Sequence, residues 1–388
     1  MKKSLLSLML GGLTIGTTEF VVMGLLPDIA SDLKVSIPVA GYLISAYALG
    51  VVIGAPLIVM MARNAPQKKI LMILAVMLTV FNSLAIIAPS YNFLFLSRLL
   101  AGLPHGAFFG VGAVVATRLA EKGKEGQAIS IMFSGLTVAN LAGVPFGTYI
   151  GHHFAWRYTF IIIAFIGLLT IAALYFWMPN LEARAKVTVK SQLQVFKKLD
   201  AWLVILITAI GTGGLFCWIS YIAPLLTNVS KFSAENVSYI LVLAGLGMVI
   251  GNLIGGKLTD RFSPEISIIA ILLSLSVDLV LVYLFSSNQY ASLILVFTTG
   301  CISFSIGSAI QILMIRTAVG SELIASASIQ AAFNVGNALG AFLGGLPLVA
   351  GFNYATPNLV GVVMSICGAL ITVFFLQRKR KLARLQNS

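Results

Sequence analysis

The sequence predicts an all-α membrane protein whose twelve transmembrane helices form two pseudo-symmetric six-helix halves. Hydrophobic residues make up 59% of the 388 residues and charged residues only 10%, with a mean hydropathy of +1.00. This composition excludes a soluble globular domain. The two other observations are a series of long apolar runs and an alternating distribution of Lys and Arg between them.

Each apolar run is long enough to cross a bilayer. A spanning helix needs about 20 residues, because each residue adds about 1.5 Å and the hydrocarbon core is about 30 Å thick. We expect spans near residues 4–26, 37–61, 70–88, 92–117, 127–150, 157–178, 201–227, 234–256, 267–287, 290–315, 323–350 and 355–377.

Basic residues set the expected orientation, because short loops rich in Lys and Arg stay on the cytoplasmic side. Of the 25 Lys and Arg residues, only Lys34, Arg157 and Lys231 lie in the intervening gaps. The even number of spans then places both termini in the cytoplasm, so we expect a multi-pass protein of the cell inner (cytoplasmic) membrane. The C-terminal tail carries a basic cluster of Arg378, Lys379, Arg380, Lys381 and Arg384.

The net charge of +13 raises the question of a nucleic-acid partner. The basic residues lie in short gaps of a membrane-embedded chain, so we expect anionic lipids at the cytoplasmic face as partners and no nucleic acid. Cys217, Cys301 and Cys367 all lie within apolar runs, which predicts neither a disulfide framework nor a metal site. We expect no cofactor and a chain that works as a monomer.

The longest polar interval separates six spans from six spans. We therefore predict an N-terminal half at 1–178, a cytoplasmic linker at 179–200 and a C-terminal half at 201–388 with a basic cytoplasmic tail. Within the linker, apolar residues at near-helical spacing predict a short amphipathic segment at the cytoplasmic surface.

The two halves also echo each other in sequence. Residues 140–147 in span 5 recur as residues 337–344 in span 11, and the Arg63-to-Pro66 loop recurs at Arg261 to Pro264. The two matches have nearly the same offset and fall at equivalent places in a six-span unit, which favours a duplicated architecture.

Three stretches resemble motifs of a known family. The loop after span 8 reads G-x-L-x-D-R from Gly256 through Asp260 and Arg261, and span 4 reads R-x-x-x-G from Arg98. Span 5 carries a Gly- and Pro-rich pattern, formed by Gly135, Asn140, Gly143, Pro145, Gly147 and Gly151. On these motifs the chain resembles the major facilitator superfamily, and within it the drug:proton antiporters and arabinose efflux permease-like proteins.

The resemblance implies the major facilitator fold and secondary active transport by alternating access. In that family an acidic residue in each half helps to latch the cytoplasmic side. Here Asp260 and Arg261 keep the second copy, whereas Ala62 stands before Arg63 in the first, which implies a weaker latch. Gly143 and Gly147, with Pro145 between them, are expected to let span 5 pack closely against a helix of the opposite half.

Two acidic residues lie well inside spans, Glu19 and Asp278. An ionised carboxylate there costs about 2.5 to 3.5 kcal/mol by insertion scales, so each needs a partner, a cavity or a proton. Glu19 and Arg98 both lie about 10 Å below the outer surface at 1.5 Å per residue. We expect them to form either a structural ion pair or a proton-coupling pair in which Arg98 tunes Glu19.

Other polar and aromatic residues complete the candidate site. His105 follows Arg98 by two helical turns and Phe109 continues that face, so His105 is either a hydrogen-bonded packing residue or a proton carrier. Asp278 lies on a span that is peripheral in this family, where it either handles protons or substrate or forms local hydrogen bonds. Candidate substrate contacts, by span number in the family, are Tyr42, Tyr47, Phe109, Asn140, Trp218, Tyr221, Asn334 and Asn337.

These side chains suit an uncharged or amphipathic organic molecule. The sequence lacks the metalloprotease, P-loop and hydrolase motifs, so it predicts no enzyme, and energy must come from a gradient. The favoured function is proton-coupled efflux of a drug, sugar or other amphipathic metabolite. A proton-coupled uptake symporter and a non-transporting receptor or sensor remain the alternatives.

Overall fold

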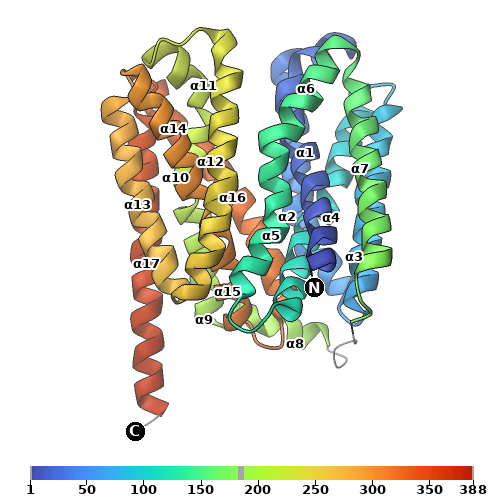
Figure 1. The fold of residues 1–388 in the computed structure, drawn as a ribbon, viewed down its shortest axis with the longest axis vertical. Coiled ribbons are helices and arrows are strands. Elements are labelled where there is room, and N and C mark those ends of the chain that lie inside the picture. Colours follow the sequence, from blue (N-terminus) through green and yellow to red (C-terminus); the bar gives the residue numbers. More distant parts are fainter. Residues whose placement is uncertain (1, 182–187, 387–388) are drawn as a thin grey trace. The chain divides into compact units, whose positions relative to one another are not determined.

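The computed structural model describes residues 2–181 and 188–386 (Figure 1). Within this described part, 12 helices are long and apolar enough to cross a membrane. This confirms the fold class predicted from the apolar runs. Residues 182–187 of the expected linker and residues 387–388 of the expected tail lie outside the described residues.

Contacts within the chain divide it into two compact units. Unit 1 comprises Met1–Leu193 and Gly320–Ala331, and unit 2 comprises Gln194–Val319 and Ala332–Ser388. The break after Leu193 falls inside the linker expected from the sequence. The short helix α8 (Val189–Leu193) ends there, and a 3-10 turn follows it.

Unit 1 contains six of the long spans, the fifth of which is interrupted by a π-helical turn at Ala139–Gly143. Its helices are α1 (Lys2–Asp32), α2 (Ile37–Ala62), α3 (Gln67–Ile86), α4 (Tyr91–Leu119), α5 (Glu125–Val138), α6 (Val144–His153) and α7 (Trp156–Trp177). The N-terminal part of α16 (Glu322–Val349), as far as Ala331, also belongs to this unit.

Unit 2 repeats this order of spans, and its last helix extends beyond the others toward the C-terminus (Figure 1). Its helices are α9 (Leu199–Leu206), α10 (Gly213–Ser220), α11 (Ile222–Pro224), α12 (Ala234–Arg261), α13 (Pro264–Phe285), α14 (Gln289–Phe304), α15 (Gly307–Thr317), the part of α16 that follows Ala331, and α17 (Pro357–Gln386).

Glycine allows the same close packing in each unit. A Cβ added at Gly54 of α2 would lie 2.2 Å from the Leu103 carbonyl oxygen of α4. In unit 2, a Cβ added at Gly251 of α12 would lie 1.8 Å from the carbonyl oxygen of Cys301 on α14. Side chains at these positions would collide with backbone, so glycine is what lets each pair of helices touch. The equivalent contacts support an internal duplication.

Left-handed backbone conformations recur with the same spacing. Lys34 and Lys231 have φ angles of 54° and 60°, and Gly123 and Gly320 have φ angles of 80° and 86°. Each pair is 197 residues apart, from 34 to 231 and from 123 to 320. Positive φ is uncommon for a residue with a Cβ. Its recurrence at Lys34 and Lys231 therefore indicates that equivalent turns connect the first two membrane spans of both units.

The fifth span changes its hydrogen-bond pattern just before a proline. The backbone N–H of Val144 donates to Ala139, one residue further back than in an α-helix. Pro145 has no N–H to continue the regular ladder, which accounts for a π-helical turn at this place.

The glycines of span 5 lie close to helices of their own unit, and the expected contact with a helix of the opposite half stays a prediction. A Cβ added at Gly143 would lie 2.7 Å from the Oγ1 of Thr17 on α1. At Gly147 it would lie 2.8 Å from Val21 of α1 and 2.9 Å from Thr159 of α7. These glycines therefore pack against helices of their own unit, because the sequence pattern shows a close approach but not which helix makes it.

Candidate functional site

A buried polar network in unit 1 joins three transmembrane helices. The hydroxyl of Thr18 on α1 donates a hydrogen bond to the side-chain oxygen of Asn82 on α3. The same hydroxyl oxygen accepts a hydrogen bond of 2.9 Å from Nη1 of Arg98 on α4. The three residues are 0%, 1% and 1% exposed, so a full cationic side chain lies inside the bundle.

Aromatic rings continue the network along α4. The Arg98 guanidinium lies over the ring of Tyr47 on α2, with its central carbon 4.3 Å from the ring centroid. The Tyr47 hydroxyl lies 3.2 Å from Nδ1 of His105, and the His105 ring meets the edge of Phe109 at 5.3 Å. Phe109 in turn stacks on Phe133 of α5 at 5.0 Å. Arg98, His105 and Phe109 therefore share one face of α4, as their spacing predicts.

Close backbone packing places Tyr47 against Arg98. A Cβ added at Gly102 would lie 2.1 Å from the Tyr47 carbonyl oxygen, and one added at Gly50 would lie 2.2 Å from that of Leu99. Because both glycines lack side chains, α2 and α4 approach closely enough for a tyrosine and an arginine to stack. The glycine stripe of the sequence thus positions the charged network.

Two nitrogens of the Arg98 guanidinium donate no hydrogen bond to any described residue. Among the described residues, Nε and Nη2 of Arg98 are buried and have no hydrogen-bond partner. Leaving a buried donor unsatisfied costs about 1 to 3 kcal/mol. A purely structural arginine would be expected to satisfy these donors. The two unsatisfied groups therefore favour a functional role for Arg98.

Glu19 lies beside this network without joining it. It is half-buried on α1, next to Thr18, and interacts electrostatically with Arg98 and Tyr47. In the described part of the chain, no hydrogen bond or ion pair connects it to Arg98. The direct pair expected from their equal depth is absent here, because one residue of helix is a rotation of about 100° and Thr18 occupies the position facing α4.

Asp278 belongs to a different set of contacts, in unit 2. It is 6% exposed on α13, and its two carboxyl oxygens lie 2.7 Å and 2.5 Å from the hydroxyls of Thr298 and Thr299 on α14. Its hydrogen-bond partners are therefore neighbours within its own unit.

The remaining candidate substrate residues lie in varied surroundings. Tyr42 is 60% exposed, and Asn140 sits in the π-helical turn with its amide donating to the Leu136 carbonyl. Trp218 is buried in the apolar core of unit 2, and Tyr221 donates 2.7 Å to the Ala341 carbonyl. Those on α16 are Asn334, which is buried, and Asn337, which is half-buried.

The residues of the expected latch lie at one end of α12. Gly256 is buried and Asp260 is half-buried, while the Arg261 guanidinium lies 5.6 Å from the Phe262 ring centroid. In unit 1, Arg63 donates from Nη1 to the Met60 carbonyl at 3.0 Å.

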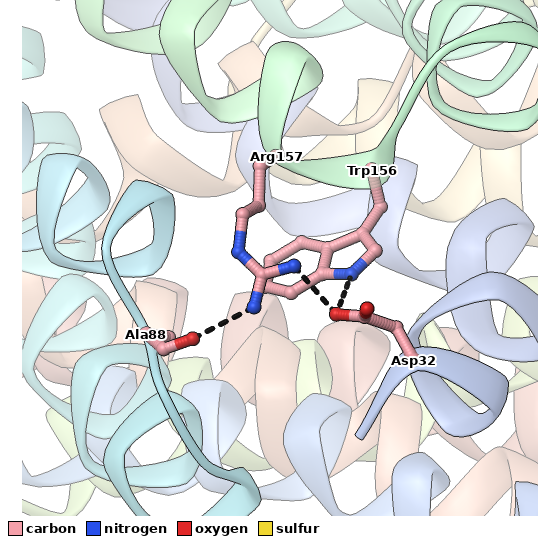
Figure 2. A network of polar contacts seen from close by, with 4 residues as sticks. All are labelled: Asp32, Ala88, Trp156 and Arg157. Atoms are coloured by element: carbon pink, nitrogen blue, oxygen red, sulfur yellow. Dashed lines mark hydrogen bonds and ion pairs between the residues drawn. The ribbon is translucent and has the colours of Figure 1, made fainter. Parts of the chain in front are cut away.

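A second charged cluster ties together one end of unit 1 (Figure 2). Asp32, at the end of α1, accepts hydrogen bonds from Trp156 at 3.0 Å and from Arg157 at 2.5 Å. Arg157 also donates 2.8 Å to the Ala88 carbonyl between α3 and α4 (Figure 2). The cluster joins three segments that are far apart in the sequence.

Sequence reasoning missed Thr18, Asn82 and Phe133. Asn82 could have been predicted, since an amide in the middle of an apolar span must find a hydrogen-bond partner. Thr18 could not, because a threonine in a transmembrane helix usually donates its hydroxyl to the backbone of the same helix.

Comparison with known proteins identifies the family. The model of the Major Facilitator Superfamily matches residues 8–328. The chain belongs to the major facilitator superfamily. It is 38% identical over 385 residues to AraJ of Escherichia coli (strain K12), a protein named as a transporter, covering 99% of this chain and 97% of AraJ. This membership makes the chain a transporter-family protein rather than an enzyme.

Two further relatives add detail. The inner membrane transport protein YdhP of Escherichia coli (strain K12) is 39% identical over 376 residues, covering 97% of this chain and 96% of YdhP. A chloramphenicol resistance protein of Streptomyces lividans is 32% identical over 350 residues, covering 89% of this chain and 88% of that protein.

Solved structures share the fold at low sequence identity. The Escherichia coli fucose:proton symporter FucP matches with a TM-score of 0.74 at 14% identity, covering 96% of this chain and 98% of that one. The proton:xylose symporter XylE matches with a TM-score of 0.75 at 16% identity, covering 95% and 94%. Together with the 12 spans, these matches establish a multi-pass membrane protein of this fold.

Proposed function

We propose that this superfamily member exports a small organic molecule by proton-coupled alternating access. The observation that carries the proposal is Glu19, a half-buried carboxyl group inside a transmembrane helix and beside the cationic network of Arg98. An ionised carboxylate is costly in hydrocarbon, and a nearby cation offsets that cost. A small movement between α1 and α4 would therefore change the protonation of Glu19.

In this proposal Glu19 takes up and releases the proton, and Arg98 controls when it does so. The unused Nε and Nη2 groups of Arg98 can donate hydrogen bonds to an approaching carboxylate without breaking the bond from Arg98 to Thr18. His105 is proposed to sense the same change through Tyr47, because their side chains are in hydrogen-bond range.

The proposed substrate is an uncharged or amphipathic organic molecule. Tyr47 and Phe109 would offer it aromatic surfaces and Asn140 an amide, a combination that favours apolar contact with few polar anchors. The further residues proposed to contact it are Tyr42, Trp218, Tyr221, Asn334 and Asn337.

The direction of transport has two candidates. The relative named for chloramphenicol resistance supports export, because a membrane transporter gives resistance by removing a drug. FucP and XylE, whose names describe proton symport, support uptake. Export is the first candidate because that relative is also the more similar in sequence.

Reconstitution tests this function. Purified protein in liposomes carrying an internal pH indicator would be exposed to chloramphenicol, fucose and xylose in turn. We expect one of these probes to drive a proton flux, with the proton moving opposite to the probe for antiport and alongside it for symport. Saturable binding without any flux would instead identify a receptor or sensor.

The proposed cellular setting is the inner membrane, with both termini in the cytoplasm, a monomeric chain and anionic lipids at the basic loops. YdhP, named as an inner membrane protein, supports this location. Reporter fusions at each terminus that are active only in the cytoplasm would test the orientation.

We also infer that the cytoplasmic latch depends on Asp260 and Arg261, with Gly256 allowing close approach, because Ala62 leaves the first copy without a carboxylate. Asp260→Asn should raise the reactivity of cysteines placed on the cytoplasmic halves of α4 and α15 toward a membrane-impermeant thiol reagent, and Ala62→Asp should lower it.

A further inference from the structure

The carboxyl group of Asp278 is embedded in the membrane part of unit 2 without a cationic partner. It is 6% exposed, and α13, on which it lies, is one of the membrane spans. Its partners are the hydroxyls of Thr298 and Thr299, and within the described residues no Lys, Arg or His forms an ion pair with it. A carboxyl group in hydrocarbon must either stay neutral or obtain a cation from outside the protein.

The Thr299 hydroxyl can form a hydrogen bond with Asp278 in either its ionised or its neutral state. Its single hydroxyl proton has two acceptors within reach, Oδ2 of Asp278 at 2.5 Å and the Leu295 carbonyl oxygen at 2.6 Å. When Asp278 is ionised, Thr299 donates to it. When Asp278 is neutral, its own O–H donates to Thr299, which then donates to Leu295. Rotation of one hydroxyl therefore satisfies either state.

A groove runs along α13 beside this carboxyl group. It has a volume of about 390 Å³ and is lined by Leu273, Ser274, Val277, Asp278, Leu281 and Ile302. Val277 and Leu273 on its rim are 61% and 47% exposed. Because these residues lie within a membrane span, what they are exposed to is the hydrocarbon of the bilayer.

The groove argues against a purely structural role for Asp278. If Asp278, Thr298 and Thr299 only joined α13 to α14, their hydrogen bonds would need no open groove beside them. Here Asp278 is one of the residues that line an open groove, and the other lining residues except Ser274 are apolar. Apolar walls with one anionic group are complementary to a molecule with an alkyl body and a single positive charge.

We propose that this groove is a binding site for a lipophilic amine that enters from the bilayer. The ammonium group would lie against the Asp278 carboxylate, and the alkyl chain would pack on Leu273, Val277 and Leu281. Binding would leave Asp278 ionised and paired. The site uses none of the residues around Glu19 and Arg98, so it does not rest on the proposed transport function.

Photolabelling can test this site directly. The probe is a ten-carbon alkyl amine carrying a diazirine, and its control is the corresponding alcohol. Purified full-length protein in liposomes would be irradiated with each probe, and labelled peptides would be mapped by mass spectrometry. We expect the amine to label the segments around Leu273–Leu281 and Ile302 about tenfold more than the alcohol, as expected for one charge-assisted contact.

Three variants decide the outcome. Asp278→Asn should reduce amine labelling to the level of the alcohol, and Glu235→Gln, which removes an exposed carboxylate elsewhere in unit 2, should leave it unchanged. Ser274→Phe fills the groove one helical turn away while keeping the carboxyl group, and it should also abolish amine labelling. Equal labelling by amine and alcohol in the wild type would overturn the proposal. If Asp278→Asn does not fold, persistent amine labelling in Ser274→Phe would overturn it as well.

Discussion

The Arg98 guanidinium is held against the face of Tyr47, 4.3 Å from its ring centroid, while two of its nitrogens lack hydrogen-bond partners among the described residues. Stacking on an aromatic ring stabilises a desolvated cation without using its N–H groups. The arginine is therefore kept in the membrane with donors ready for another group. Glu19 is the nearby acidic side chain with which Arg98 interacts electrostatically, and among the described residues no hydrogen bond or ion pair joins the two.

The first prediction concerns Glu19→Gln, which imitates the protonated carboxyl group. The variant should fold and bind substrate, but transport driven by a pH gradient should fall at least about tenfold, because no proton can be released. The measurement is probe-stimulated proton flux in liposomes, alongside probe exchange at equal pH on both sides. Exchange should persist. Glu235→Gln is the control, and unchanged gradient-driven flux in Glu19→Gln would remove Glu19 from the coupling role.

The second prediction separates stability from function at Arg98. Arg98→Met replaces a buried cation, partly unsatisfied, by an apolar side chain of similar length. The change removes two unsatisfied buried donors, each of which costs about 1 to 3 kcal/mol, and Glu19 can stay protonated when the cation is absent. We expect the melting temperature of purified Arg98→Met to be unchanged or higher, while proton-coupled flux is lost.

A fall in melting temperature would instead show that Arg98 mainly holds α1, α2 and α4 together. Tyr47→Phe is a useful companion, because it keeps the stacked ring but removes the hydroxyl that reaches His105. It should affect coupling more than melting, since an intramolecular hydrogen bond contributes only about 0.5 to 1.5 kcal/mol.

The sequence predicted the architecture well, because span length and loop charge are imposed by the bilayer and can be read locally. It also predicted that Arg98, His105 and Phe109 share a face, since seven residues are close to two helical turns. It did not identify Thr18 or Tyr47 as partners of Arg98. Those contacts depend on which helices are neighbours and on their rotation, neither of which is a property of one segment.

The sequence likewise shows where glycine permits a close helix contact but not which helix makes that contact. The spacing of Gly143 and Gly147 predicted a close helix contact, and the structure shows such contacts with α1 and α7 of the same unit. A missing side chain allows an approach from any helix. Only the folded arrangement selects the partner.

The third prediction tests that partner for Gly143. A Cβ there would lie 2.7 Å from Oγ1 of Thr17, whose hydroxyl donates to the Leu13 carbonyl at 2.8 Å. Gly143→Ala should lower the melting temperature because Thr17 must move. Thr17→Ala should recover much of the loss, with a coupling of about 1 kcal/mol in a double-mutant cycle. Strict additivity of the two effects would argue that Gly143 meets another helix.

The fourth prediction compares two glycines of α2. A Cβ at Gly54 would meet the Leu103 backbone at 2.2 Å, which no rotamer change can relieve, whereas Gly41 has nothing within 4 Å. Gly54→Ala should therefore destabilise or prevent folding. Gly41→Ala should be neutral or stabilising by up to about 1 kcal/mol, because alanine favours helix. Similar melting temperatures for both variants would contradict the close α2–α4 packing.

The last prediction concerns the cluster of Figure 2, where an ion pair and a buried aromatic ring both stabilise one end of unit 1. The side chains of Arg157 and Asp32 are 32% and 46% exposed, so their ion pair is screened and should contribute less than about 1 kcal/mol. Trp156 is 2% exposed and packs edge-on against Phe160 at 5.8 Å. Its replacement by alanine should cost about 3 to 5 kcal/mol.

We therefore expect Asp32→Asn to lower the melting temperature slightly, and less so in high salt, while Trp156→Ala lowers it severely. Trp156→Phe keeps an aromatic ring but loses part of the buried volume and the hydrogen bond to Asp32, so its melting temperature should lie between those of Asp32→Asn and Trp156→Ala. If Asp32→Asn proved as damaging as Trp156→Ala, charge rather than burial would hold this end of unit 1 together.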